Sequence, residues 1–194
     1  MRIWYDTEFL EDGRTIELIS IGMVAEDGRE FYAVNEEIDT GSLHELICQH
    51  QWLMENVVPS LPLHTDTRGQ KSHGRISTSS RYQGFFNLDM TSNEVMPRRM
   101  IRNAVRDFIL ATPDVELWAW YGAYDHVALA QLWGRMIHLP KGVPMWTNDL
   151  KQECMRLGNP DMPVQAEGQH NALADARHNR VMHEFLESLA AGDA

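Results

Sequence analysis

Residues 1–35 carry short apolar runs that predict β-strands rather than helices. The runs cover residues 3–9, 15–24 and 30–34, and they are rich in Ile, Val, Tyr and Phe. Residues that favour turns fill 11–14 and 27–28, and each of these turns contains an Asp-Gly pair, a strong hairpin signal. The chain is therefore predicted to open as a three-stranded antiparallel meander.

After this meander, helical and strand-like patterns alternate, as they do in α/β proteins. Apolar residues recur at helical spacing over 41–58, 97–108, 127–133, 150–157 and 171–189. An aromatic strand is predicted at 115–121 and a short strand at 145–147. Because a helix precedes the aromatic strand, that strand should run parallel to an earlier one. We predict a single α/β domain over 1–194, whose central mixed sheet has about five strands, three antiparallel and then two parallel, flanked by helices.

Residues 64–93 lose this periodicity and are dominated by Ser, Thr, Gly and Gln. The pattern predicts a long loop with at most one short element, near Phe85 and Phe86. A structureless loop of this length is uncommon inside a compact domain, and it is usually either functional or disordered. We therefore expect a flexible, basic insertion here.

Positive charge is concentrated in this insertion and in the helix that follows it. No acid occurs from 67 to 88, and the helix carries arginines at i and i+4 spacing. The basic residues of the two segments are Arg68, Lys71, His73, Arg75, Arg81, Arg98, Arg99, Arg102 and Arg106. Two interpretations stay open: a solvated helix face beside a flexible loop, or a local electrostatic funnel for a phosphate backbone.

The bulk composition is that of a soluble globular protein. Of 194 residues, 43% are hydrophobic and 23% are charged, and the net charge is −11. This charge argues against a broad grip on a polyanion, but it permits local binding through metal ions and a few arginines. Cys48 and Cys154 are isolated, which favours a reducing compartment. We see no signal peptide and no apolar run near the length of about 20 residues that a membrane span needs, so we expect a cytoplasmic protein without a membrane partner.

Asp6 and Glu8 end the first apolar run and are the first candidates for chemistry. At i and i+2 on a strand, their side chains point to the same face. Two like charges side by side repel each other and resist desolvation unless a cation or a shared proton compensates. The pair is either a solvated strand end or half of a metal site.

Three further residues extend this pattern. Asp125 follows the aromatic strand, where it is either a helix N-cap or a ligand at the carboxyl end of a parallel strand. Asp175 interrupts a run of small residues on a helix, a position that disfavours a carboxylate unless it is paired or binds a ligand. His170 lies five residues earlier. It is either a surface or capping residue or a general base, since its ordinary pKa lies near neutrality.

The order of these residues resembles the DEDDh 3′→5′ exonucleases of the ribonuclease H-like superfamily. The motifs are DTEF at 6–9, AYDHVAL at 123–129 and HNALAD at 170–175. The flanking sequences YDTEF at 5–9, TIELISIG at 15–22 and LWAWYGAYDH at 117–126 are similar to the exoribonuclease AS group, polyadenylate-degrading relatives of ribonuclease T. The similarity covers most of the chain and departs from the group over residues 64–93. It implies a ribonuclease H-like fold.

The resemblance also implies a two-metal hydrolysis. Mg²⁺, for which Mn²⁺ can substitute, would occupy two positions in the active site. Asp6 would bridge both ions, Glu8 and Asp175 would complete the site that holds the attacking water, and Asp125 would serve the other ion. His170 would take the proton from the water, and a nucleoside 5′-monophosphate would leave the 3′ end of single-stranded, adenylate-rich RNA.

Four residues are expected to contact the substrate. Thr7 lies between the first two acids, and Phe9 either packs in the core or stacks on the terminal base. Arg98 and Arg102 are expected to contact RNA, within one chain or across the homodimer that the resemblance implies.

Two other functions and one structural expectation complete the predictions. The same scaffold could trim single-stranded DNA or short oligonucleotides, or it could be an RNA-binding module that has lost catalysis, although the complete set of acids and His170 argues against the second. The tryptophans Trp4, Trp118 and Trp120 fall in predicted strands, so they are expected in the core rather than as base platforms.

Overall fold

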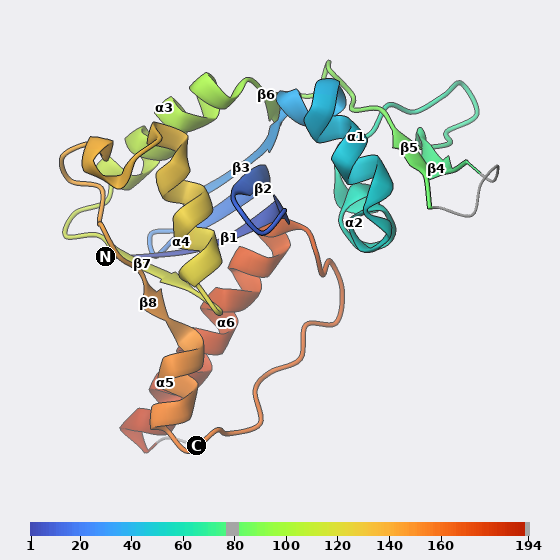
Figure 1. The fold of residues 1–194 in the computed structure, drawn as a ribbon. Helices are drawn as coiled ribbons and strands as arrows, with labels where there is room; N and C mark the ends of the chain where they lie inside the picture. Colours follow the sequence, from blue (N-terminus) through green and yellow to red (C-terminus); the bar gives the residue numbers. More distant parts are fainter. Residues whose placement is uncertain (77–81, 193–194) are drawn as a thin grey trace.

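A six-stranded mixed sheet forms the centre of the protein in a computed structural model, which describes residues 1–76 and 82–192 (Figure 1). The strand order across the sheet is β6-β3-β2-β1-β7-β8. The strands are β1 (Arg2–Glu11), β2 (Ile16–Ala25), β3 (Glu30–Asn35), β6 (Val95–Met96), β7 (Glu116–Ala119) and β8 (Asn148–Asp149). A separate two-stranded sheet pairs β4 (His73–Arg75) with β5 (Gly84–Phe86).

Strand directions confirm the predicted α/β class. Strands β1, β2 and β3 form the antiparallel meander, and β7 and β8 add to it in parallel. This antiparallel-then-parallel sheet with flanking helices is the predicted ribonuclease H-like arrangement. The strand that the sequence pattern missed is β6, which pairs in parallel with β3 over two residues and is too short to show a period.

Helices cover both faces of the sheet (Figure 1). They are α1 (Gly41–Gln49), α2 (Gln51–Asn56), α3 (Arg98–Leu110), α4 (Ala123–Ala130), α5 (Leu150–Arg156) and α6 (Ala172–Ala191). Helices α3 and α4 pack on one face, and α6 packs on the other. The single helix predicted over 41–58 is broken at His50, whose extended backbone ends α1 and whose side chain accepts a hydrogen bond from the Leu53 N–H to cap α2.

Side-chain alternation along β1 fixes the environment of its acids. Ile3 and Tyr5 are buried against α3 and α4, whereas Trp4 packs with Met182 of α6 on the opposite face. By the same alternation, Asp6 and Glu8 share the face of Trp4, as predicted. The paired acids therefore point toward α6.

Gly22 lets α6 approach the sheet beside Asp6. Gly22 is the β2 partner of Asp6 in the antiparallel register. A Cβ atom at Gly22 would collide with the backbone of Ala172 and Leu173, where α6 begins. The missing side chain thus allows the first turn of α6, which carries Asp175, to sit directly on β2.

Residues 64–93 are more structured at their ends than the sequence predicts. The β4–β5 hairpin lies here, and Leu63 and Leu88 form an isolated antiparallel bridge. Phe86 and Leu88 are buried with α1 and α2, so these two side chains belong to the core. The short element predicted near Phe85 and Phe86 is β5, whereas β4 was not predicted, because a three-residue strand is too short for periodicity to show. Arg81 falls in 77–81, outside the described residues, and the flexibility of the insertion and the single-domain boundary stay predictions.

Smaller corrections concern element boundaries near the acids. β7 ends at Ala119, so Trp120 and Tyr121 follow the strand instead of belonging to it. Helix α4 begins at Ala123 after its cap Gly122, so Asp125 lies in the first turn and is not the N-cap. The last short strand is β8 at 148–149 and not at 145–147. Within the described residues, no helix combines the length and apolarity needed to span a membrane.

Candidate active site

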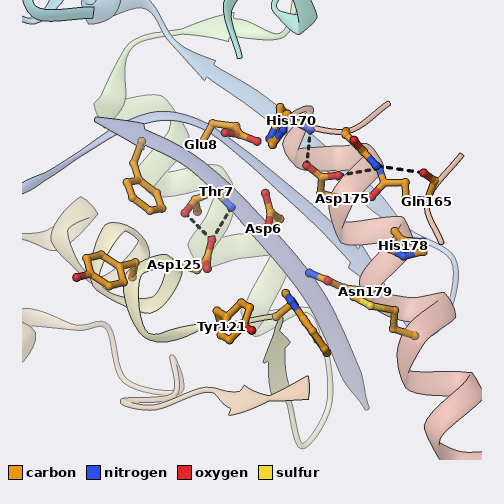
Figure 2. A pocket seen from close by; sticks show the side chains of 15 residues that line it. Asp6, Thr7, Glu8, Tyr121, Asp125, Gln165, His170, Asp175, His178 and Asn179 are labelled. Atoms are coloured by element: carbon orange, nitrogen blue, oxygen red, sulfur yellow. Dashed lines mark hydrogen bonds between the residues drawn. The ribbon is translucent and has the colours of Figure 1, made fainter. Parts of the chain in front are cut away.

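A pocket of about 640 Å³ opens where β1 passes between α4 and α6 (Figure 2). Its walls come from segments that lie far apart in the sequence. The lining residues are Asp6, Thr7, Glu8, Phe9, Trp120, Tyr121, Tyr124, Asp125, Gln165, Gln169, His170, Asp175, His178, Asn179 and Met182. All four predicted acids and the predicted His therefore face one cavity.

Asp125 is held by the exposed edge of β1. β7 pairs with β1 only from Arg2 to Trp4, so beyond Trp4 this edge of β1 has backbone groups available for other partners. The Asp125 Oδ1 accepts hydrogen bonds from the Thr7 N–H (2.8 Å) and the Thr7 hydroxyl (2.7 Å). Thr7 and Asp125 are both buried. Thr7 is thus placed to orient Asp125, which differs from the substrate contact predicted for it.

Asp175 is oriented by two donors from outside its helix. The Asn171 side chain caps α6 by accepting from the Ala174 N–H (3.1 Å), and this places Asp175 in the first turn. The Asp175 Oδ2 accepts from the His170 N–H (2.8 Å), and its Oδ1 accepts from the Gln165 side-chain amide (2.7 Å). The carboxylate is therefore fixed before any ligand arrives.

His170 adopts a left-handed backbone and is supported from an unrelated part of the chain. Its φ is 63°, a conformation that is uncommon for residues other than Gly. The Ser60 hydroxyl donates to the His170 carbonyl oxygen (2.7 Å), and the ring of Trp52 meets the imidazole edge-on at 4.9 Å between centroids. Side chains from 52–60 thus hold the strained residue in place.

Glu8, His170 and Asp175 form a group with the spacing of metal ligands. One ligand atom from each lies within 4.8 Å of the others. Asp6 and Asp125 line the same pocket outside this group. Asp125 and the side chain of Thr7 lie on the other side of β1 from Asp175 and His170 (Figure 2). Among the residues that the structure describes, no Lys or Arg lines the pocket. Lys and Arg side chains therefore do not compensate these acids within the pocket, although the charges of His170 and His178 lower the pKa of Asp175.

The pKa values of all four acids are raised, chiefly because the carboxyl groups are buried. Burial, then the charges of Asp125, Glu8 and Asp175, raise the pKa of Asp6 well above its ordinary value. Burial, with Asp175 and Asp125, raises the pKa of Glu8 to about 8. Burial raises the pKa of Asp125 to about 6, although hydrogen bonds from Thr7 lower it, and burial also raises the pKa of Asp175. A bound divalent cation would remove this penalty, so the donor set suits hard, oxygen-preferring metals.

The other predicted contacts divide into two groups. Phe9 lines the pocket, packs against the core and stacks on Tyr124 with 5.9 Å between centroids and 9° between planes, so both of its predicted roles are compatible with its position. Arg98 and Arg102 do not line the pocket. The Arg98 guanidinium pairs with Glu17 (3.4 Å) and donates to the Gln131 carbonyl (3.1 Å), and Arg102 is exposed on α3.

Several pocket residues were not predicted from the sequence. Tyr121 and Tyr124 stand in the same stretch as Asp125, and the aromatic run there is a signal that could have found them. Gln165 comes from a segment without a chemical motif, so nothing in the sequence marks it. The same holds for Trp52, which contacts His170 but does not line the pocket. Trp4 is in the core as predicted, whereas Trp118 and Trp120 are partly buried and Trp120 also lines the pocket.

Comparison with known proteins assigns the chain to a family. A family model described as the 3′-5′ exoribonuclease Rv2179c-like domain matches residues 1–186. The chain belongs to this family. The 3′-5′ exoribonuclease Rv2179c of Mycobacterium tuberculosis (strain ATCC 25618 / H37Rv) is 42% identical over 179 residues, which cover 91% of this chain and 88% of the relative. The 3′-5′ exoribonuclease MT2234.1 of strain CDC 1551 / Oshkosh has the same identity and coverage.

Membership in the Rv2179c-like family confirms the predicted class of 3′-5′ exoribonucleases. The finer resemblance to the exoribonuclease AS and ribonuclease T group stays a prediction. Two solved structures are also similar. Pop2p of S. pombe with bound Mg²⁺ and Mn²⁺ has a TM-score of 0.47 at 13% identity, covering 99% of this chain and 84% of Pop2p. A yeast NOT1 MIF4G–CAF1 structure scores 0.48 at 12% identity, covering 98% of this chain and 80% of that one. At these scores neither likeness bears on function.

Proposed function

We propose that this protein is a metal-dependent 3′→5′ exoribonuclease that releases nucleoside 5′-monophosphates from single-stranded RNA. The observation that carries the proposal is the convergence of Asp6, Glu8, Asp125, Asp175 and His170 on one pocket that no Lys or Arg of the described residues lines. Such a set of carboxylates suits hard divalent ions, which in turn bind phosphate oxygens. The family name supports the same activity and substrate.

The four acids would hold the metal, and the resemblance to two-metal nucleases supports Mg²⁺ or Mn²⁺. Glu8 and Asp175 lie together at the His170 end of the pocket, Asp125 lies across β1, and Asp6 lies on β1 between them (Figure 2). We assign Asp6 to both ion positions because it is the acid flanked by the other three. When bound, divalent ions neutralise the charge that builds up on the attacking and leaving oxygens of a phosphodiester.

His170 would serve as the general base. Its ring lies within ligand distance of Glu8 and Asp175, so it can take a proton from a water molecule held by these two residues. The contacts from Ser60 and Trp52 fix the imidazole at the pocket wall. As the water oxygen bonds to phosphorus, the bond from phosphorus to the 3′-oxygen of the preceding nucleotide would break, and that oxygen would take a proton from solvent. The 3′-terminal nucleoside 5′-monophosphate would then be released, and His170 would pass its proton to solvent.

Phe9 would receive the terminal base. Its ring lines the pocket beside Thr7 and is stacked on Tyr124, which gives a flat apolar surface of the kind that nucleobases stack on. Stacking tolerates any base, so the adenylate preference that we propose rests on the sequence resemblance alone.

The proposal is tested with end-labelled poly(A), mixed-sequence RNA and single-stranded DNA, each incubated with Mg²⁺ or with a chelator. We expect stepwise shortening of the RNAs with mononucleotide release in Mg²⁺ and none with chelator. Faster shortening of DNA would favour the DNA-trimming alternative. Binding without mononucleotide release from any substrate would leave the protein as an RNA-binding module and would refute the enzyme proposal. The homodimer and the cytoplasmic location stay predictions, to be checked by light scattering and by fractionation.

A further inference from the structure

A second, smaller hollow shares the Tyr124 side chain with the candidate active site. It measures about 260 Å³ and lies between the β1–β2 turn and helix α4. Gly13, Arg14 and Thr15 line it from the turn, Val127 lines it from the helix, and Gln131 lines it just after the helix. Because Tyr124 lines both cavities, the two are adjacent at this side chain.

Arg14 supplies the positive charge that the larger pocket lacks. Among the residues that line these two cavities, Arg14 is the one Arg or Lys. The turn that carries it is well fixed, because the Asp12 Oδ1 accepts from the Arg14 N–H (2.8 Å) and the Thr15 N–H (2.9 Å). Glu11 also lines the hollow, but its Oε1 accepts from the Gly13 N–H (2.6 Å) and is thereby directed to the backbone.

The helix side of the hollow offers an exposed aromatic and apolar surface. Tyr124 is 54% exposed and Val127 is 42% exposed, although large apolar side chains usually avoid water. The Tyr124 ring is held in place by its stack on Phe9. A fixed, accessible ring beside a cation matches the two parts of a nucleotide, which are a flat base and a charged phosphate.

The chemistry of the reaction indicates which nucleotide would enter this hollow. In an in-line displacement at phosphorus, the attacking oxygen and the leaving oxygen lie on opposite sides of the phosphate. His170, the proposed base, lies at one end of the pocket, and Asp125 lies across β1 (Figure 2). The leaving oxygen should therefore face Asp125. Tyr124 precedes Asp125 on α4, so the nucleotide attached to that oxygen leads into the hollow.

We infer that the hollow between the β1–β2 turn and α4 is the subsite for the penultimate nucleotide, which carries the leaving 3′-oxygen, with Tyr124 against its base and Arg14 on the phosphate at its 5′ side. This inference rests on the proposed exoribonuclease function and adds a substrate-binding site to it. The phosphate that Arg14 binds is one step upstream of the bond that is cut. Arg14 therefore contributes to substrate affinity and not to the chemical step.

Two adenylate dinucleotides test the role of Arg14. ApA contains only the phosphate that is cut, whereas pApA adds a phosphate on the 5′ side of the penultimate nucleotide. With Mg²⁺ and the full chain, wild type should prefer pApA by about threefold to tenfold in kcat/KM, the size expected for one accessible charge-assisted contact. Arg14→Gln should abolish the preference by lowering kcat/KM for pApA to that for ApA. Arg14→Lys should keep part of the preference, and Arg14→Glu should reverse it.

Lys141→Gln is the matched control, because Lys141 is exposed and lines neither cavity. It removes one positive charge and should leave the pApA preference as in wild type. An equal loss in Lys141→Gln would show a general charge effect and overturn the assignment, as would an unchanged preference in Arg14→Gln and Arg14→Glu. If wild type hydrolyses no RNA of any length, the proposed function itself fails, and that result is distinct from hydrolysis without a role for Arg14.

Discussion

Asp125 and His170 stand at opposite ends of one pocket, and the protein holds them there by different means. Asp125 is buried on a helix, and both of its hydrogen bonds come from Thr7, a neighbour of Asp6 on the same strand. His170 sits just before α6 with a left-handed backbone, and Ser60 and Trp52 support it from a distant part of the chain. The position of Asp125 depends on β1 and on the helix that carries it, whereas the position of His170 depends on how α2 and the following turn pack.

This difference indicates which parts of the site should tolerate change. The Asp125 end is built from elements whose order in the sheet is fixed by long hydrogen-bonded strands. The His170 end is built from side-chain contacts across a surface, and each such contact is worth about 1 kcal/mol. We therefore expect the His170 end to lose its geometry first when single contacts are removed, whereas a change to Asp6, which lies between the ends, should affect both.

Asp6→Asn should have the largest effect because it removes the acid that we assign to both metal positions. We expect kcat/KM on poly(A) to fall by about 10⁴-fold, in line with the several kcal/mol that metal ions contribute to phosphoryl chemistry. Isothermal titration with Mn²⁺ should show weakened binding as well. The metal-free variant should melt no lower than wild type, since one of four crowded carboxylates is gone. Activity within tenfold of wild type would contradict the assignment of Asp6.

His170→Ala tests the other end alone. We expect kcat to fall by about 10³-fold, within the range for loss of a general base, while Mn²⁺ affinity and RNA binding are retained. The measurement is single-turnover hydrolysis together with metal titration. Because His170 lies within ligand distance of Glu8 and Asp175, a large loss of Mn²⁺ affinity would instead identify the imidazole as a metal ligand. Full turnover at neutral pH would exclude both roles.

Protonation should make the metal-free fold depend on pH. The folded pKa of Glu8 is raised to about 8 and that of Asp125 to about 6, so the folded protein binds protons more tightly than the unfolded chain. The associated stability is complete below the ordinary pKa values near 4 and is lost as the pH rises through about 6 to 8. With chelator present, the melting temperature should fall by about 5 °C or more between pH 5 and pH 8.

Added Mn²⁺ provides the control for this pH dependence. The ions require ionised carboxylates, so their stabilising effect should increase over the same pH interval. Glu8→Gln should flatten the metal-free curve, because it removes a carboxyl group whose pKa is raised to about 8. A metal-free melting temperature that rises from pH 5 to pH 8 would show that the acids are not crowded in solution.

A pair of conservative changes compares the two ends directly. Thr7→Val removes one of the two hydrogen bonds to Asp125, and Ser60→Ala removes the hydroxyl that supports the His170 carbonyl. We expect kcat to fall by about tenfold in Ser60→Ala, because His170 then lacks its anchor, and by less in Thr7→Val, because the Thr7 N–H still holds Asp125. A larger loss in Thr7→Val would reverse the comparison between the ends.

The same contrast explains how much of the site could be predicted from the sequence. Asp6 and Glu8 follow from strand alternation, and Asp125 follows from its place after a parallel strand, since these are local patterns with a fixed geometry. The supports of His170 could not be predicted. Trp52 and Ser60 reach it across more than 100 residues of chain, and they carry no motif, so only the folded packing reveals them.

The fold shows a similar division. The long strands and α6 were predicted because several periods of a pattern fit within each of them. β6 and β4 have two and three residues, so they contain no full period and were missed, whereas β5 matches the short element predicted near Phe85 and Phe86.

The smallest expected effect concerns the arginines of α3, which lie away from both ends of the pocket. Arg98 is engaged with Glu17 and the Gln131 carbonyl, whereas Arg102 is exposed. If α3 contacts RNA upstream, Arg102→Ala should lower the slope of log affinity against log salt concentration by about 0.7, the value for one phosphate contact on a single strand. Arg98→Ala should change the slope less and lower the melting temperature instead, since it breaks contacts within the protein. The measurement is fluorescence anisotropy of labelled poly(A) with Ca²⁺ in place of Mg²⁺. Unchanged slopes in both variants would remove α3 from the RNA path.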